Sequence, residues 1–232
     1  MSRSKIKKFS ELATFTNYLN GEVPMKGKWN VHYFRNENPL VLELGCGKGE
    51  YTNHLAHVFP DRNFTGIDLK GARLWAAAKA SQNIQLSNVA FLQINIDKLT
   101  DHFDREEVDE IWIPFPDPYP KPSKWKKRLI SSWYLNKYKQ VLKKEGMIHF
   151  KTDNLALYHF ALDTINKEDH DIVMHTDDLY NSAIQNEYNS IPTWFEHIFR
   201  EKGESIKYIC FQLNNTQKAF PSATEDTESL TL

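Results

Sequence analysis

The sequence predicts an α/β fold with a mostly parallel, seven-stranded sheet and helices on both of its faces. Two observations support this expectation. From Pro39 onward, short apolar runs alternate with helical patterns, and such alternation implies crossover connections between parallel strands. The chain has 232 residues, which is enough for one α/β domain with a sizeable core.

The expected elements begin with an N-terminal extension, residues 1–38. Residues 1–9 are expected to be flexible, and Ser10 is suited to cap a short helix that ends at Leu19. The main domain covers residues 39–213, and a polar tail, residues 214–232, is expected to be disordered. The expected strands are residues 39–44, 63–69, 89–95, 107–113, 147–153, 171–175 and 205–213, and the expected helices are residues 50–58, 70–86, 124–143, 154–165 and 194–202.

The helix expected at residues 124–143 should contact the core through four apolar side chains. Gly146 should end this helix and open the fifth strand, because glycine disfavours a helix interior. The last two strands should form a hairpin-like pair. The expected core contacts of the helix are Leu129, Trp133, Leu135 and Val141.

Composition and charge exclude several classes of protein. The formal net charge is −1, so affinity for nucleic acid would have to come from local basic segments. Cys46 and Cys210 stand far apart, which offers neither a disulfide framework nor a metal-ligand set. No apolar run is long enough to cross a bilayer, and we expect a cytosolic protein. Charge gathers in a basic head (Arg3, Lys5, Lys7, Lys8), a basic segment after Pro120 and an acidic tail (Glu225, Asp226, Glu228).

A proline-rich loop follows the expected fourth strand. Proline removes a backbone donor and fixes φ, so neither a helix nor a central strand can continue through alternating prolines. The stiff loop carries the carboxylate of Asp117 and the aromatic ring of Tyr119, which favours a functional site over a spacer. The simpler alternative is that Asp117 only stabilises the turn. The prolines are Pro114, Pro116, Pro118 and Pro120.

The basic segment after this loop, residues 121–128, is a candidate nucleic-acid contact. Its cations stand at the start of an expected helix, where positive charge opposes the helix dipole and adds no stability. Trp125 could stack on a base or anchor the segment in the core. The alternative is a solvated helix start, because charge runs usually face water. The charged residues are Lys121, Lys124, Lys126, Lys127 and Arg128.

A glycine-rich turn, residues 45–49, joins the first strand of the domain to its helix. Glycine allows positive φ and lets a ligand lie against the backbone, so Gly45 and Gly47 are candidate cofactor contacts. Glu43 would repel a pyrophosphate and suits a ligand with an ammonium group and no phosphate, such as S-adenosylmethionine. Without a ligand, the turn would be a tight strand-to-helix connection.

Two polar residues end the next two expected strands. Asp68 stands about twenty residues after the glycines, where an acid can accept both hydroxyls of a ribose. Asn95 ends the third strand, where an amide could read an adenine edge. Both could instead have local roles, Asp68 as an acid at a helix N-terminus and Asn95 in a turn.

Together these motifs resemble the tRNA (guanine-N7)-methyltransferases of the bacterial single-chain type. The resemblance runs from about residue 40 to about residue 203 and includes LELGCGKGEYT, GIDL, PFPDPYPK and FKTDN. It also includes a late element, residues 193–196, in which Thr193 and Glu196 have capping-box spacing as well. The sequence departs from the family in three ways: Tyr119 replaces a tryptophan, SKWKKR replaces a run rich in histidine and arginine, and Phe195 replaces a tyrosine.

The resemblance implies a Rossmann-like class I methyltransferase fold and methylation of N7 of guanosine 46 in the variable loop of tRNA. The implied cofactor is S-adenosyl-L-methionine, no metal is implied, and a monomer or a homodimer would be compatible with the sequence. Asp117 would be the catalytic residue. Together with Gly45 and Gly47, the cofactor contacts would be Glu43, Asp68, Asn95 and Asp117. The substrate contacts would be Lys121, Asp153, Thr193, Trp194, Phe195 and Glu196, and the RNA contacts would be Ser123, Lys124, Trp125, Lys126, Lys127 and Arg128.

The chemistry of guanine defines the expected role of Asp117. Guanine N7 carries a lone pair and loses no proton on methylation, so a general base is not required. We therefore expect Asp117 to orient the guanine and to stabilise the positive charge that develops on it, with support from Asp153.

Three other functions remain as alternatives. A small-molecule methyltransferase on the same sheet would not need the basic segment. A non-catalytic RNA-binding protein would not need Glu43, the glycine turn and Asp68. A nicotinamide enzyme is disfavoured by Glu43 and by the spacing of the glycines.

Overall fold

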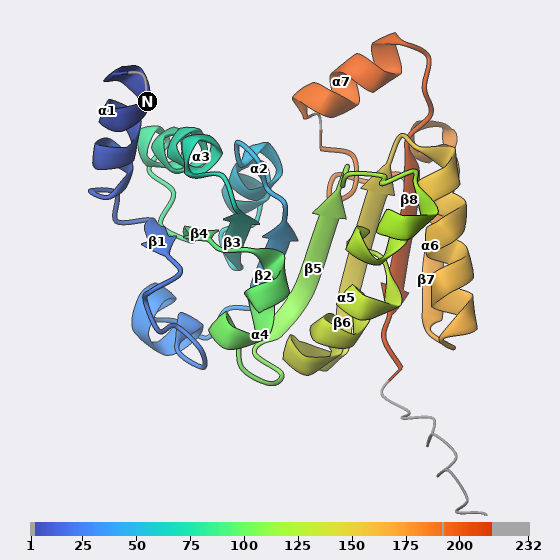
Figure 1. The fold of residues 1–232 in the computed structure, drawn as a ribbon, viewed down its shortest axis with the longest axis horizontal. Coiled ribbons are helices and arrows are strands. Elements are labelled where there is room, and N and C mark those ends of the chain that lie inside the picture. The colour runs from blue at the N-terminus through green and yellow to red at the C-terminus, as the bar shows by residue number, and fades with distance from the viewer. Residues whose placement is uncertain (1–2, 192, 215–232) are drawn as a thin grey trace, which may run out of the picture.

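The computed structural model describes residues 3–191 and 193–214. Within these residues the chain forms one eight-stranded sheet, in the order β1-β4-β3-β2-β5-β6-β8-β7 (Figure 1). Paired strands are parallel except at β8, which runs antiparallel to both β6 and β7. The strands are β1 (Tyr18–Asn20), β2 (Leu40–Leu44), β3 (Asn63–Asp68), β4 (Val89–Gln93), β5 (Val108–Pro114), β6 (Leu142–Thr152), β7 (Asp171–Thr176) and β8 (Lys207–Gln212).

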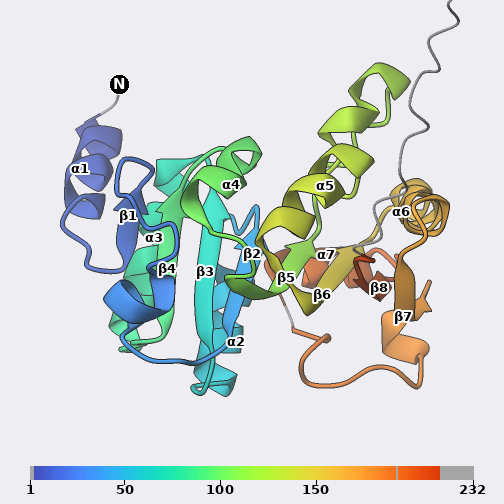
Figure 2. The ribbon, with the colours of Figure 1, turned by 90° about the horizontal axis from the view of Figure 1, so that it is seen from below.

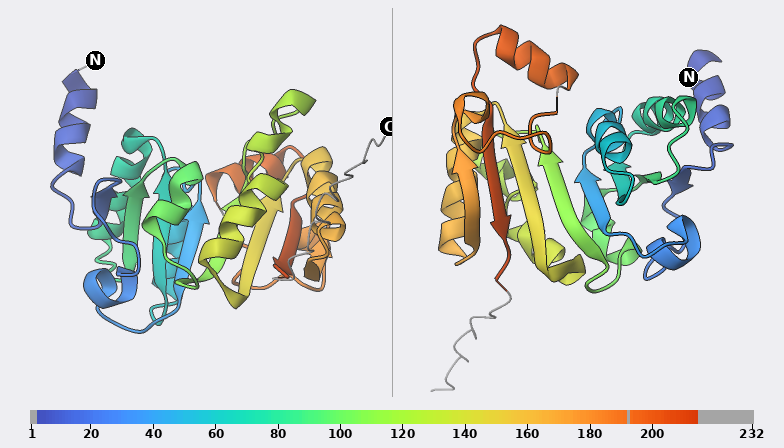
Figure 3. Two further views of the ribbon diagram at one scale, coloured as in Figure 1. Left: turned by 60° about the horizontal axis from the view of Figure 1, so that its bottom comes forward. Right: turned by 180° about the vertical axis from the view of Figure 1, so that it is seen from behind.

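Helices cover both faces of this sheet (Figure 2). The first three lie on one face and the next three on the other, while the last lies over the carboxyl ends of β5 and β6 (Figure 3). The fold class expected from the sequence is therefore confirmed. The helices are α1 (Arg3–Leu12), α2 (Glu50–Val58), α3 (Gly71–Asn83), α4 (Leu99–His102), α5 (Ser132–Val141), α6 (Leu155–Lys167) and α7 (Trp194–Glu201).

The central strands are buried on both faces, which explains their nearly continuous apolar sequence. Alternate residues of β2 enter different clusters of the core. Leu42 and Leu44 pack with residues of α4, α5 and α6, whereas Val41 packs with residues of α1, α2 and α3. Because a parallel strand in this position needs apolar groups on both sides, the run at residues 39–44 could be predicted without any tertiary information.

The expected strand count of seven is wrong, because β1 adds an eighth strand at the edge of the sheet. The helix expected from Ser10 to Leu19 is also wrong, because the helix at this end of the chain is α1, which ends at Leu12. The flexibility expected of residues 1–9 stays a prediction. Ser10 lies within α1, where its hydroxyl donates to the carbonyl oxygen of Lys7 (2.9 Å) instead of capping a helix. The backbone N of Phe91 in β4 donates to the carbonyl oxygen of Asn17 (2.7 Å). Pairing with a strand far along the chain therefore decides the structure of this segment.

The contacts of α1 explain why the residues before Ser10 are helical. Glu11 accepts hydrogen bonds from the indole of Trp75 (3.0 Å) and from Lys79 Nζ (2.8 Å), both on α3. Because helices of this length are marginal in isolation, docking onto α3 supplies the missing stability. The division into an extension and a domain at residue 39 stays a prediction, although β1 joins both parts in one sheet.

The single helix expected at residues 124–143 is wrong, because the structure has two helices in this region. The chain forms a 3₁₀ helix, Pro122–Lys127, then a break, and then α5, which ends at Val141 rather than at Gly146. Leu135 and Val141 are buried as expected, and Leu129 packs against the core. Trp133 is not a core residue, since 45% of its surface is exposed. The break arises because Arg128 turns back toward the proline loop.

The other expected strands and helices are present, with ends shifted by a few residues. Strand β6 starts earlier than expected, at Leu142. No described helix is long and apolar enough to span a membrane. Among the described residues, no group of three or more histidine, cysteine, aspartate or glutamate side chains is arranged to hold a metal ion. The predicted disordered tail lies outside the described residues, apart from Asn214.

Candidate active site

The carboxyl ends of five parallel strands bring most of the predicted site residues to one edge of the sheet. The glycine turn follows β2, Asp68 ends β3, Asn95 follows β4, Asp117 follows β5 and Asp153 follows β6. The chain order reverses between β2 and β5, and open parallel sheets bind ligands in the crevice at such a position.

The three glycines of the turn have positive φ values of 78°, 57° and 71° at Gly45, Gly47 and Gly49. A Cβ atom on Gly45 would meet nothing within 4 Å, and one on Gly47 would meet only the carbonyl oxygen of Gly45, at 4.0 Å. A Cβ atom on Gly49 would lie 2.7 Å from the Cβ of Ala77. Gly45 and Gly47 therefore leave backbone open to a ligand, whereas Gly49 allows α2 to pack against α3.

Asp68 lies directly beside this turn. Its carboxylate accepts hydrogen bonds from the backbone N of Gly47 (3.1 Å) and of Lys70 (2.7 Å). Arg73 Nη1 lies 3.6 Å from the same carboxylate. The glycine turn and the acid are thus held together as one unit, beside the backbone that Gly45 and Gly47 leave open.

Glu43 is buried beneath the turn. Both the backbone N (2.8 Å) and the hydroxyl of Thr52 donate to its Oε2. Burial raises the pKa of Glu43 to about 8, with the nearby Asp68 and Glu50 acting in the same direction. A buried acid with a raised pKa gains most from a cationic partner, so this position can hold the ammonium group of a ligand.

Asn95 has the local role that the sequence left open. Its side chain accepts a hydrogen bond from the backbone N of Asp97 (3.1 Å), and it caps the short 3₁₀ helix Ile96–Lys98. The residue is exposed at the sheet edge next to β3. A contact with an adenine stays a prediction.

The proline loop is fixed at both of its ends. At the start, the backbone N of Phe115 donates to the carbonyl oxygen of Lys151 in β6 (2.9 Å). At the end, Arg128 donates to the carbonyl oxygens of Pro118 (2.8 Å) and Tyr119 (3.2 Å). Phe115 and Tyr119 have positive φ values of 50° and 40°, a costly conformation for residues with side chains. This backbone leaves Asp117 exposed at the tip of a rigid loop.

Arg128 differs from the other cations of the basic segment. Its guanidinium lies 4.3 Å from the ring centre of Phe160 and 4.9 Å from that of Trp125, and only 5% of the residue is exposed. Burial also lowers its pKa. The side chain thus supports the loop, and the predicted RNA contact of Arg128 remains untested. Exposed side chains are found at Lys121, Ser123, Lys124, Trp125, Lys126 and Lys127.

Trp125 has features of both roles that the sequence allowed. One side of its ring contacts Phe160, with ring centres 5.6 Å apart, yet the residue is exposed. It lines a cavity of about 470 Å³ together with Pro118, Pro120, Arg128 and Phe160. The cavity adjoins the proline loop through Pro118 and Pro120.

Asp153 and the late element lie at the same sheet edge. Asp153 is half-buried, and burial raises its pKa. Thr193 caps α7 by accepting from the backbone N of Glu196 (3.2 Å), as the capping-box spacing predicts. The backbone N of Trp194, which is exposed, donates to Glu50 at the start of α2 (2.7 Å).

Comparison with known proteins identifies the family. A family model described as "Putative methyltransferase" matches residues 37–209. A tRNA (guanine-N(7)-)-methyltransferase of Christiangramia forsetii is 41% identical, over 91% of this chain and 99% of that protein. A protein of the same name from Porphyromonas gingivalis is 46% identical, over 82% of this chain and 78% of that protein. This chain belongs to the tRNA (guanine-N7)-methyltransferase family.

Comparison with solved structures confirms the methyltransferase fold of this chain. A crystal structure of a SAM-dependent methyltransferase from Aquifex aeolicus matches 92% of this chain and 100% of its own, with a TM-score of 0.53. The sequence identity is 16%, so this likeness concerns the fold alone.

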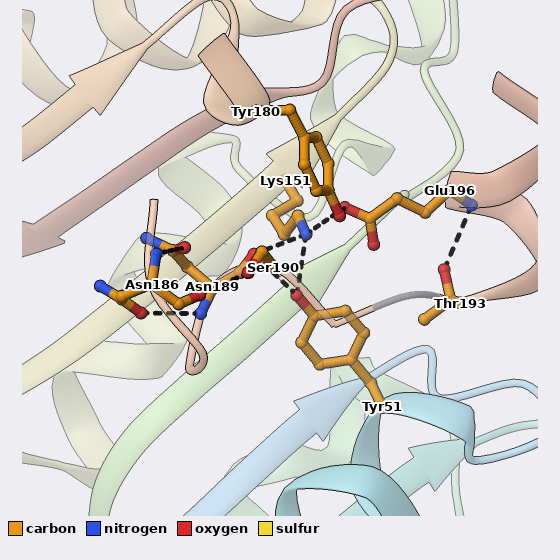
Figure 4. Close-up of polar contacts among 8 residues, drawn as sticks. All are labelled: Tyr51, Lys151, Tyr180, Asn186, Asn189, Ser190, Thr193 and Glu196. Atoms are coloured by element: carbon orange, nitrogen blue, oxygen red, sulfur yellow. Dashed lines mark hydrogen bonds and ion pairs between the residues drawn. The ribbon is translucent and has the colours of Figure 1, made fainter. Parts of the chain in front are cut away.

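One residue of this family member that the sequence did not single out is Lys151. It lies in the FKTDN motif and is completely buried in β6, with 0% exposure. Its Nζ donates to Glu196 Oε1 (2.5 Å), which also accepts from the hydroxyl of Tyr180 (2.7 Å) (Figure 4). Glu196 is therefore not exposed at the sheet edge, and its predicted contact with substrate stays a prediction. The side chain of Phe195 lies outside the described part of the chain.

Sequence contained one signal for Lys151. A lysine in a strand expected to lie inside the sheet is unusual, because a buried ammonium group needs partners. Burial lowers the pKa of Lys151 to about 8, while Glu196 acts against this shift. The identity of its partners could not be read from the sequence, since Glu196 and Tyr51 are far from it in the chain.

Proposed function

We propose that this protein methylates N7 of guanosine in tRNA, at position 46 of the variable loop, with S-adenosylmethionine as methyl donor. The observation that carries the proposal is the shared sheet edge. There the open glycine turn with Asp68, the exposed Asp117 and the exposed lysines after the proline loop lie at adjacent strand ends. The position in tRNA comes from the resemblance of the motifs. Because the proposed substrate is tRNA, we expect the protein to act in the cytoplasm.

The proposed cofactor fits the chemistry of the residues present. Its ammonium group would meet Glu43, its ribose hydroxyls Asp68 and its adenine Asn95, while Gly45 and Gly47 leave room for it on the backbone. When bound, S-adenosylmethionine supplies a methyl group activated by a positively charged sulfur.

We expect cofactor affinity to depend on pH because of Glu43. Its raised pKa, about 8, means that the carboxyl group is mostly protonated in the free protein at pH 7. A bound ammonium group favours the carboxylate, so binding should release up to about one proton, and the affinity should rise by up to about tenfold per pH unit below pH 8. Isothermal titration calorimetry with S-adenosylmethionine in buffers of different ionisation enthalpy measures both effects. Glu43→Gln should bind S-adenosylmethionine more weakly, and its affinity should lose most of its dependence on pH. An unchanged pH profile in that variant would contradict this role of Glu43.

Asp117 would act on guanine rather than as a base. Its carboxylate can accept hydrogen bonds from N1–H and the exocyclic amine, and its charge stabilises the positive charge that the purine gains. The rigid support of the loop by Arg128 and Lys151 limits its movement, which favours a geometrically demanding transfer. Lys121, Asp153 and residues 193–196 would complete the guanosine site.

The exposed lysines of the basic segment would bind phosphates of the tRNA. Each lost phosphate contact should reduce the slope of log affinity against log salt concentration by roughly 0.7 to 0.9. We therefore expect a reduced slope for Lys126→Ala and for Lys127→Ala in filter-binding titrations from 50 to 200 mM salt, roughly the range over which such contacts are measured. Lys144→Ala, which removes an exposed lysine at the opposite end of β6, is the matched control. Equal slopes in all four proteins would favour a merely solvated segment.

The deciding experiment is incubation of the protein with labelled S-adenosylmethionine and bulk tRNA, followed by chemical cleavage at 7-methylguanosine. We expect cleavage at position 46, and loss of labelling when that guanosine is replaced by adenosine in a transcript. Label on a small molecule instead of RNA would favour the small-molecule alternative. Binding of tRNA with neither labelling nor cofactor binding would favour a non-catalytic RNA-binding protein.

A further inference from the structure

The ammonium group of Lys151 uses all three of its hydrogen-bond donors inside the protein. They go to Glu196 Oε1 (2.5 Å), the carbonyl oxygen of Asn189 (2.7 Å) and the hydroxyl of Tyr51 (3.0 Å). Figure 4 shows the lysine in the middle of these three groups. They come from α7, from the segment before α7 and from α2, so a single side chain joins three separate parts of the chain.

The main chain of Lys151 adds a fourth connection. Its carbonyl oxygen accepts the hydrogen bond from Phe115 that fixes the start of the proline loop (2.9 Å). The Nζ atom also lies 5.8 Å from the ring centre of Phe115. Lys151 thus links the loop that carries Asp117 to the N-terminal end of α7.

Stability does not explain why a charged pair occupies this place. Removing an ammonium and a carboxylate from water is costly, and apolar residues of similar size often stabilise a core equally well. The second carboxylate oxygen of Glu196, Oε2, is also buried and accepts no hydrogen bond from the described residues. A buried acceptor without a partner adds to this cost, so the pair is kept for a reason other than stability.

We propose that Lys151 is a positioning residue, which holds Glu196 and the start of α7 in place against the loop that carries Asp117. Through this contact it fixes how the guanine lies when it reacts. The inference rests on the proposed function, because it names a further residue of the same site. Lys151 itself is buried behind Glu196 and Tyr51 and would not touch the tRNA.

The test uses Lys151→Met, Glu196→Gln and the double variant in the tRNA methylation assay, at temperatures where each protein is folded. Displacement of a reacting group by about 1 Å can cost about 10²-fold in rate, so we expect kcat of Lys151→Met to fall by about that factor. The KM for tRNA should change little, since the exposed lysines remain.

Because Lys151 acts through Glu196, the losses of kcat in the two single variants should not multiply in the double variant. The double variant should have a kcat close to that of the slower single variant, whereas independent roles would give roughly the product of the two losses. Stability should behave differently. Lys151→Met leaves a buried carboxylate without its counter-ion and should lower Tm by roughly 6 to 20 °C, and Glu196→Gln added to it should restore much of that loss.

An ion pair at the opposite end of β5 and β6 provides the control. Lys143 Nζ lies 2.6 Å from Asp109 Oδ1, at the amino ends of β6 and β5 and away from the catalytic edge. The double variant Lys143→Met/Asp109→Asn should keep its kcat. A wild-type kcat in folded Lys151→Met, multiplicative losses, or an equal loss in the control would each overturn the proposal. Failure of the wild-type protein to methylate tRNA would instead overturn the proposed function.

Discussion

Asp117→Ala is expected to lower the single-turnover rate of tRNA methylation by about 10²- to 10³-fold, the usual cost of removing one group that stabilises a developing charge. The expectation depends on the position of the side chain. Asp117 is exposed at the tip of a loop that Phe115 and Arg128 fix at both ends, so the substitution removes a carboxylate without disturbing the support. The free energy of unfolding of the variant should therefore lie within about 0.5 kcal/mol of the wild-type value.

Asp117→Asn separates the two proposed contributions of this carboxylate. Asparagine keeps an oxygen that can accept from guanine but has no charge, so an intermediate rate would show that orientation and field both contribute. Asp61→Ala, which removes an exposed acid at the opposite edge of the sheet, is the control and should react like wild type. A near wild-type rate for folded Asp117→Ala would exclude the proposed role and would leave Asp117 as a turn residue.

Alanine at two glycines of the turn should act on different properties. Gly49→Ala should mainly lower the stability of the protein, and Gly47→Ala should mainly lower its affinity for the cofactor. In Gly49→Ala the new Cβ would meet Ala77 at 2.7 Å and the Phe91 ring at 2.8 Å, at a backbone φ of +71°. Overpacking together with the left-handed backbone should destabilise the protein by roughly 2 to 5 kcal/mol. Gly47→Ala has open space instead and should cost only about 1 to 2 kcal/mol for its backbone.

The affinity for the cofactor should fall more in Gly47→Ala than in Gly49→Ala. The Cβ of Gly47→Ala projects into the space that a ligand on the turn would occupy, so the folded variant should bind S-adenosylmethionine at least about tenfold more weakly, a loss of 1.4 kcal/mol or more. Differential scanning fluorimetry and calorimetric titration measure the two quantities. If Gly47→Ala binds the cofactor like wild type, the ligand does not lie on this turn.

Much of the fold could be predicted because its signals are local. The buried strands read as apolar runs, and the helices α2, α3, α6 and α7 follow helical patterns with suitable ends, such as the capping contact of Asn154 to the backbone N of Leu157 (2.8 Å). Parallel strands then bring Glu43, Asp68, Asn95, Asp117 and Asp153 to the same edge. This placement follows from topology alone, which is why these residues could be named before any distance was known.

The errors occur where contacts distant in sequence override local preference. Phe15 and Leu19 are spaced as on one side of a helix, but β4 offers backbone partners to residues 18–20. Residues 124–143 look like one helix, but Arg128 leaves that pattern to bind two carbonyl oxygens of the proline loop. In both segments, hydrogen bonds to another part of the chain are worth more than the continuation of a regular element.

The sequence by itself determined the fold class, the family resemblance and the identity of the polar residues at the strand ends, because periodicity and motifs are properties of neighbouring residues. Only the tertiary structure decided what each of them contacts. It showed that Gly49 is packed against α3 whereas Gly47 is open, that Arg128 supports the proline loop, and that Lys151 contacts Glu196 and Tyr51. These distinctions depend on side chains that meet across the folded sheet, and a buried charge does not reveal its partner until the chain has brought the two together.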